Sequence, residues 1–262
     1  MIDQIVFSHA NGFPTKCYSH FFEQLSEFTI NGIPMSGNNL KSIEIGWESL
    51  CDELISFIVE RHNRPVIGLG HSMGAVFMLM AAKKRPELFE QVILMDPPIM
   101  GKEQRGLIAK RQQDGKVHEV LSVAQKAKIR KENFPSMELV ERVMKGKGLF
   151  QQFHPTCFND YLNGAFTSMD DDTVTLTYPK NLEYTIFCTI PPFAEPFNIL
   201  PPVHYIYATS GEIFESRLDG IEELKTIIPS AQFIPFEGGH LFPFEQPSEV
   251  ANLIKRLLKG SN

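Results

Sequence analysis

The sequence has few of the features that mark a metal, redox or membrane protein. Its four cysteines, Cys17, Cys51, Cys157 and Cys188, are far apart and form no CxxC pair, so we predict neither a zinc site nor a dithiol redox site. The apolar run at residues 73–82 is much shorter than the roughly 20 residues of a membrane-spanning helix. The amino terminus has no basic segment followed by a long apolar run. We therefore expect no secretory signal and a cytoplasmic location with reduced thiols.

Excess positive charge is also absent. The chain has 25 Lys and Arg residues against 31 Asp and Glu residues, for a formal net charge of −6. A general nucleic-acid binder needs a concentrated positive field, so we expect neither nucleic acid nor a membrane as a partner. With 43% hydrophobic residues in 262, the chain can build a large core, and extensive disorder is excluded. The length fits one large domain, or a core with an inserted segment.

Strand and helix patterns alternate at both ends of the chain. Short apolar runs predict strands at residues 5–8, 28–33, 65–69, 91–95, 203–208 and 231–236. Apolar residues at helical spacing predict helices at 47–61, 73–84, 218–227 and 250–257. Because strands that alternate with helices form parallel sheets, we predict an α/β fold with a mostly parallel central sheet and helices on both faces.

The intervening segment, residues 99–200, interrupts this alternation. Its first part, residues 102–131, has helical spacing with nine basic and three acidic residues, and residues 166–178 alternate as in a hairpin. We interpret the basic run as a solvated helical face. Since long excursions in α/β folds usually carry function, we predict a mainly helical cap at 99–200, with residues 1–98 and 201–262 forming the core.

The strongest chemical motif is Gly70-His71-Ser72-Met73-Gly74, which fits G-x-S-x-G. It lies between a predicted strand and a predicted apolar helix. A serine nucleophile needs this sharp strand-to-helix turn, which projects its hydroxyl above the sheet. The helix that follows also favours negative charge at its amino terminus. The context therefore predicts that Ser72 is a nucleophile.

A serine hydroxyl needs a base and an orienting carboxylate. His240 follows the last predicted strand, which puts it in a loop at the same sheet edge as Ser72. Two carboxylates also follow strands at this edge. Asp96 comes directly after its strand and is held by two prolines, whereas Glu212 lies four residues beyond its strand. The sequence favours Asp96 and keeps Glu212 as the alternative acid.

The developing oxyanion needs two backbone N–H donors. We expect one from Met73, the residue after the nucleophile. The other should come from the loop after the first strand, where Phe13 is the first choice and Ala10 and Asn11 are rivals. We also predict that the substrate contacts Asn11 and two aromatic residues of the intervening segment; these are Phe153 and Phe166.

With these residues in place, the sequence resembles the α/β-hydrolase superfamily. Residues 11–14 (Asn-Gly-Phe-Pro) are similar to its oxyanion loop, 70–74 to its nucleophile elbow and 239–243 to its histidine loop. Members of that family begin with a strand hairpin, whereas this chain starts almost directly at the oxyanion strand. We therefore expect a sheet that lacks one or two leading strands. The usual Gly-x-x-Asp after the penultimate strand is absent, which also favours Asp96.

The sequence therefore predicts a serine hydrolase that cleaves a small carboxylic ester through an acyl-enzyme, without a cofactor or metal. The rival from another class is a ligand-binding or signalling protein that keeps the hydrolase pocket and turns over slowly or not at all. Thioesterase, C–C bond hydrolase and perhydrolase activities share the same residues and stay open, as does the oligomeric state.

Overall fold

A six-stranded parallel sheet forms the centre of the computed structural model, which describes residues 3–38, 46–193, 201–211 and 221–260. The strand order is β2-β1-β3-β4-β8-β9, and every neighbouring pair is parallel. The strands are β1 (Gln4–Ser8), β2 (Thr29–Gly32), β3 (Val66–His71), β4 (Phe89–Met95), β8 (Val203–Ala208) and β9 (Ala231–Phe236). In the described ranges β2 is an edge strand, in agreement with the prediction that the sheet lacks one or two leading strands.

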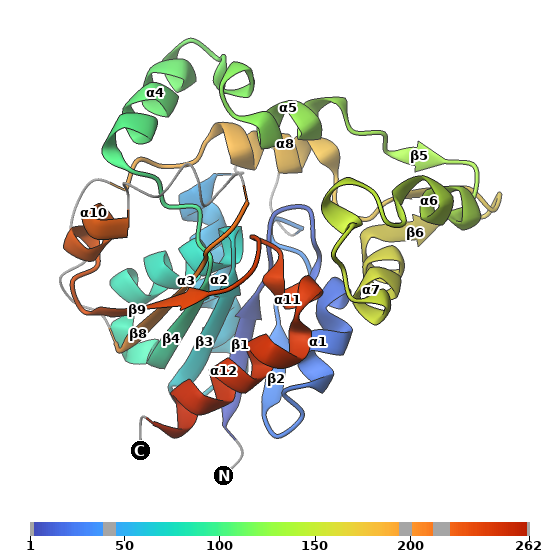
Figure 1. The fold of residues 1–262 in the computed structure, drawn as a ribbon. Coiled ribbons are helices and arrows are strands. Elements are labelled where there is room, and N and C mark those ends of the chain that lie inside the picture. The colour runs from blue at the N-terminus through green and yellow to red at the C-terminus, as the bar shows by residue number, and fades with distance from the viewer. Residues whose placement is uncertain (1–2, 39–45, 194–200, 212–220, 261–262) are drawn as a thin grey trace.

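Helices cover both faces of the sheet (Figure 1). On one face lie α2 (Trp47–Arg61) and α3 (Met73–Lys84), and on the other lie α1 (Ser19–Glu23) and α12 (Pro247–Lys259). Helix α2 buries one stripe of residues at helical spacing, whereas residues 73–82 of α3 are all buried. An apolar helix of this kind is stable only when protein surrounds it. The predicted α/β fold class is confirmed.

The described part of the intervening segment lies over the carboxyl edge of the sheet, opposite the edge where the amino terminus lies (Figure 1). It contains α4 (Lys102–Gln113), α5 (Ser122–Ile129), α6 (Met137–Met144), α7 (Pro155–Ala165) and α8 (Lys180–Cys188). It also contains a small antiparallel sheet of β5 (Asn133–Phe134), β7 (Val174–Leu176) and β6 (Phe166–Ser168). Strands β6 and β7 form the predicted hairpin.

The basic run at 102–131 is divided into two helices. Gly115, in the left-handed region with φ 66°, follows α4 and lets the chain turn before α5. The sequence analysis did not find α7 and α8. Helix α7 contains two asparagines and Gly164, which are weak helix formers, so its stability depends on its buried face. The other helices in the described part of the chain are α10 (Ile221–Ile227), α11 (Phe242–Glu245), η1 (Thr15–Tyr18), η3 (Pro86–Leu88), η4 (Val117–Glu119) and η5 (Gly148–Phe150).

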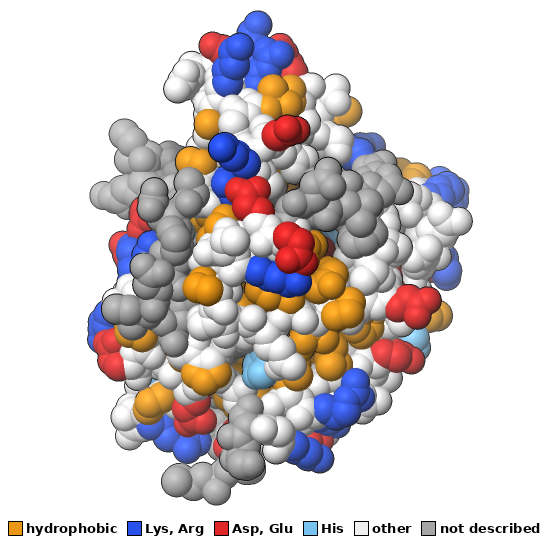
Figure 2. Space-filling model, turned by 60° about the vertical axis from the view of Figure 1, so that its left-hand side comes forward, with side chains coloured by type: hydrophobic (Ala, Val, Ile, Leu, Met, Phe, Trp, Pro, Cys, Tyr) orange, Lys and Arg blue, Asp and Glu red, His pale blue; other side chains and the backbone are white. Residues whose placement is uncertain are grey.

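The surface carries interspersed charges of both signs around a patch of hydrophobic side chains on the face shown in Figure 2. Within the described ranges, no helix is long and apolar enough to span a bilayer.

Candidate active site

Ser72 lies at the turn between β3 and α3. Its φ of 53° is in the left-handed region, which is strained for a residue with a side chain. The turn fits only because glycines flank it. A Cβ on Gly70 would lie 2.5 Å from Ala75 Cα, and one on Gly74 would lie 2.1 Å from the Ser8 carbonyl oxygen. The two glycines therefore allow the close backbone approach that the elbow needs.

The register of the sheet brings three more strand ends to this edge. Ser8 pairs with Gly70, His71 pairs with Met95, and Met95 pairs with Ile206. Residues that follow β1, β3, β4 and β8 therefore gather at one side of the sheet, as the sequence predicts for an open parallel sheet.

Ser72, His240 and Asp96 form a continuous hydrogen-bonded chain. His240 Nε2 is 2.9 Å from Ser72 Oγ, and His240 Nδ1 is 2.5 Å from Asp96 Oδ2. Asp96 is fully buried, and its Oδ1 accepts a hydrogen bond of 3.0 Å from the backbone N–H of Ala208. An ionised carboxylate only accepts, so His240 donates from Nδ1 and its Nε2 lone pair faces the serine hydroxyl. Glu212, the alternative acid, lies outside the described residues.

A second chain of hydrogen bonds holds the surrounding loops, and the sequence analysis missed it. His71 Nε2 lies 3.0 Å from the His240 carbonyl oxygen, which can only accept, so this nitrogen carries the proton. His71 Nδ1 then accepts from the Tyr18 hydroxyl at 2.7 Å, and the Tyr18 oxygen accepts from the Ala10 N–H at 3.2 Å. Burial and the nearby His240 lower the pKa of His71 to about 3, which keeps it neutral.

The backbone hydrogen bonds show which of the expected oxyanion donors have an N–H that the protein does not use. Met73 begins α3, and the first N–H groups of a helix have no partner within the helix. The predicted Phe13 N–H, however, donates to the Ala10 carbonyl oxygen at 3.0 Å in a tight turn. The Ala10 N–H is held by Tyr18. Of the three candidates, Asn11 alone has an N–H without an acceptor within the described ranges.

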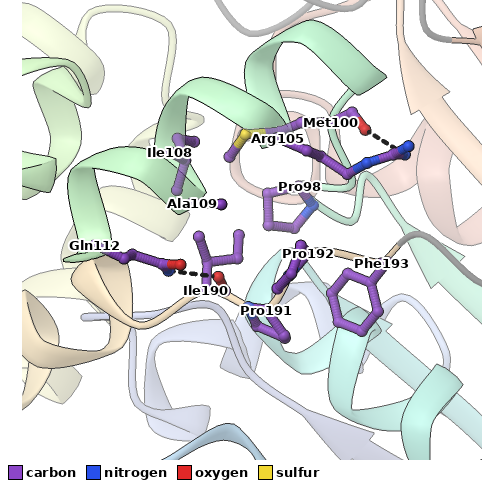
Figure 3. A pocket seen from close by; sticks show the side chains of 10 residues that line it. All are labelled: Pro98, Met100, Arg105, Ile108, Ala109, Gln112, Ile190, Pro191, Pro192 and Phe193. Carbon is purple, nitrogen blue, oxygen red and sulfur yellow. Dashed lines mark hydrogen bonds between the residues drawn. The ribbon is translucent and has the colours of Figure 1, made fainter.

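A cavity of about 620 Å³ opens above Ser72. Its lining comes from the site loops, α2 and the intervening segment, and most of it is apolar; the residues include Asn11, Phe13, Trp47, Ser72, Met73, Met100, Leu121, Lys126, Arg130, Leu149, Phe150, Tyr161, Glu183, Ile186 and His240. Figure 3 shows a smaller pocket beside it, where Gln112 of α4 donates to the Ile190 carbonyl oxygen. At about 10 Å³ this pocket holds little more than one water molecule.

The predicted contacts of Phe153 and Phe166 with substrate are not supported. Both side chains are buried and neither lines the cavity. Phe153 stacks on Phe244 with ring centroids 5.0 Å apart, and Phe166 packs edge to face against Phe134. Phe153 and Phe166 belong to a buried hydrophobic cluster that contains residues of both the intervening segment and the sheet. The aromatic lining from that segment includes Phe150 instead.

An ion pair from the intervening segment contacts the oxyanion loop. The Arg130 guanidinium donates to Glu183 Oε2 at 2.8 Å and to the Tyr161 hydroxyl at 2.6 Å. The Glu183 carbonyl oxygen accepts from Asn11 Nδ2 at 2.9 Å. Gly12, with φ 77°, faces this pair so closely that a Cβ there would lie 2.8 Å from Glu183 Oε1. The segment thus helps to fix the position of Asn11.

Within the described residues, no group of three or more His, Cys, Asp or Glu side chains is arranged to hold a metal ion.

Comparison with known proteins gives one family match. The model of the α/β hydrolase fold family matches residues 49–247. No curated protein matches the chain. Solved structures with a similar fold include E-2-(acetamidomethylene)succinate hydrolase, at 15% identity and a TM-score of 0.78 over 99% of this chain and 92% of that one.

Two other solved structures are similar at the same level. The thioesterase domain from the curacin biosynthetic pathway has 16% identity and a TM-score of 0.72, over 97% of this chain and 90% of that domain. An esterase of M. tuberculosis has 13% identity and a TM-score of 0.74, over 98% and 86% of the two chains. At these identities the likeness establishes the fold alone.

Proposed function

The chain belongs to the α/β hydrolase fold family, and from that premise we propose that it is a serine hydrolase that cleaves a small carboxylic ester. The observation that carries the proposal is the distance of 2.9 Å between Ser72 Oγ and His240 Nε2, with the opposite ring nitrogen bonded to the buried Asp96. This arrangement matches a nucleophile, a general base and an orienting carboxylate.

The proposed reaction begins when Ser72 Oγ attacks the acyl carbon and gives its proton to His240 Nε2. Asp96 stabilises the resulting imidazolium and does not itself take the proton. The N–H groups of Met73 and Asn11 stabilise the tetrahedral oxyanion. The intermediate collapses when His240 returns the proton to the leaving alkoxide, which leaves an acyl-serine. Water then attacks the acyl-serine, again with His240 as base, and releases the acid.

The segment at 99–200 is proposed to act as a cap that selects the substrate. In support, residues from α4, α5 and α8 line the cavity above Ser72. The cavity is of the size that binds small molecules, and its mostly apolar lining suits an alkyl or aryl acyl group.

The test uses p-nitrophenyl esters of increasing acyl length and a fluorophosphonate probe. The wild-type protein should turn over at least one ester many times and should be labelled at Ser72. Ser72→Ala should lower kcat by roughly 10⁶-fold and abolish labelling. Absence of both turnover and labelling in the wild type would refute the proposal. Labelling with a single turnover, and a change in binding to a partner, would instead favour a ligand sensor.

A thioesterase is the second candidate, because a thioesterase domain shares this fold at a TM-score of 0.72. Matched oxygen esters and thioesters of the same acyl group distinguish the two activities. A preference of kcat/KM for the thioester by more than ten-fold would replace the ester proposal.

A further inference from the structure

The charged side chains that line the cavity are not balanced. They are the cations Lys126 and Arg130 and the carboxylate Glu183. Glu183 is paired with Arg130 at 2.8 Å, so these two charges offset each other. The Lys126 ammonium has no hydrogen-bond or ion-pair partner within the described parts of the chain. Among the described residues, the lining therefore carries one positive charge that no carboxylate offsets, on the exposed side chain of Lys126.

The Arg130 guanidinium has more N–H groups than it has acceptors among the described residues. A guanidinium has five N–H groups, and the protein accepts from Nη1 through Glu183 and from Nη2 through Tyr161. The remaining N–H groups have no protein acceptor within the described ranges. Because Tyr161 and Glu183 fix the guanidinium plane, these N–H groups are held in place before a ligand arrives.

Both cations line the same cavity, and Arg130 lies beside the loop at residues 9–14. Lys126 lies in the last turn of α5, four residues before Arg130. Arg130 directly follows the last residue of α5, and its Nη1 would lie 3.3 Å from a Cβ on Gly12. The positive region thus borders the part of the cavity where the acyl group would bind.

We infer that the substrate carries an anionic group, a carboxylate, which binds to Lys126 and to the free N–H groups of Arg130. The inference rests on the proposed ester hydrolysis and names its substrate class: a carboxylic ester with an apolar body and a second, ionised acid. The apolar walls, which include Trp47, Leu149 and Ile186, would cover the body of the substrate.

Two residues of the basic run at 102–131 have a different position from the others. Nine basic residues lie in it, and most belong to the solvated face that the sequence predicts. Lys126 and Arg130 differ from the rest because they line the cavity. Lys128 is a suitable contrast: it lies on the same helix but contacts His118 and the Tyr184 ring outside the cavity.

The kinetic test compares mono-p-nitrophenyl esters of glutaric and suberic acid with the same compounds capped as methyl esters. The wild type should prefer at least one free acid to its capped partner in kcat/KM. Lys126→Gln should lower kcat/KM for that acid about three- to ten-fold, the range for an exposed charged hydrogen bond, and should lower it by a smaller factor for the capped ester. Lys128→Gln should alter neither substrate. The preference should also weaken in 1 M NaCl, because salt screens an open site.

A binding test separates this inference from catalysis. Trp47 is the only tryptophan of the chain and lines the cavity, so its fluorescence should report binding. The Ser72→Ala protein is titrated with monomethyl glutarate and monomethyl suberate and with the two dimethyl esters. At least one acid should bind more tightly than its dimethyl ester, and Lys126→Gln should remove that difference while Lys128→Gln should not.

Equal binding of acid and capped ester at both lengths, or an equal loss of both in Lys126→Gln, would overturn the anion site. If the wild type hydrolysed neither ester but the acid still bound preferentially through Lys126, ester hydrolysis would be refuted and the anion site would stand.

Discussion

Replacing Asp96 with asparagine tests the proposed role of this carboxylate most sharply. The substitution keeps the shape of the side chain but makes one of its two oxygens an NH₂ group. The backbone N–H of Ala208 donates to Oδ1 at 3.0 Å, so the asparagine oxygen must stay there. The NH₂ group must then face His240 Nδ1, where the carboxylate now accepts at 2.5 Å.

This forced orientation reverses the imidazole tautomer. An NH₂ group can only donate, so Nδ1 becomes the acceptor and the ring proton moves to Nε2. The nitrogen that faces Ser72 then carries a proton and cannot act as a base. We expect kcat to fall about 10⁴-fold, equivalent to about 5 kcal/mol at 1.36 kcal/mol for each ten-fold change.

The assay is hydrolysis of the best p-nitrophenyl ester at pH 7, with KM and the urea unfolding curve measured beside it. KM and the unfolding midpoint should change little, because Asp96→Asn is isosteric and Ala208 keeps its acceptor. Glu212→Gln should retain wild-type kcat. If Asp96→Asn kept more than about a tenth of kcat while Glu212→Gln lost it, Glu212 would be the acid and the tautomer argument would be wrong.

Two further predictions concern stability. Gly74→Ala places a Cβ 2.1 Å from the Ser8 carbonyl oxygen and should destabilise the fold by about 1–3 kcal/mol or more. Gly106→Ala, in open space on α4, should stabilise the fold by about 0.5–1 kcal/mol. Similar urea midpoints for the two variants would contradict the tight fit of the turn at Ser72. Burial lowers the pKa of His71 to about 3 and of His9 to about 4, from 6.5. The unfolded chain therefore binds protons below pH 6.5 that the folded chain does not, so stability should fall as the pH falls, by roughly 2 kcal/mol per histidine between pH 6.5 and 5. An unfolding free energy that is constant over this range would refute the neutral state of both rings.

Local motifs were sufficient to predict the strand-to-helix elements around Ser72 and the loop of His240. Helices at 47–61 and 73–84 have the predicted bounds, because their apolar periodicity determines which face is buried. The choice of Asp96 rested on its place directly after a strand, and the buried hydrogen bonds of Asp96 agree with that reasoning without testing its role.

Other features depend on contacts between distant parts of the chain. The Phe13 N–H donates to the Ala10 carbonyl oxygen in a local turn. This turn depends on backbone angles that the sequence does not reveal. Phe150 lines the cavity and Phe153 does not, because the turns at 148–153 set their directions. The pairing of Arg130 with Glu183 joins residues 53 positions apart, beyond the reach of periodicity.

The hydrogen bond between Asn11 Nδ2 and the Glu183 carbonyl oxygen limits how freely the segment at 99–200 can be replaced. Helix α8 supplies a backbone carbonyl oxygen to Asn11 Nδ2 and a carboxylate that lies against Gly12. A chimera that replaced residues 99–200 with the equivalent region of another protein would therefore remove support from the loop at residues 9–14, which it left unchanged in sequence. If residues 99–200 select the substrate as proposed, a change in that segment also alters the support of Asn11, so both sides of this boundary have to change together.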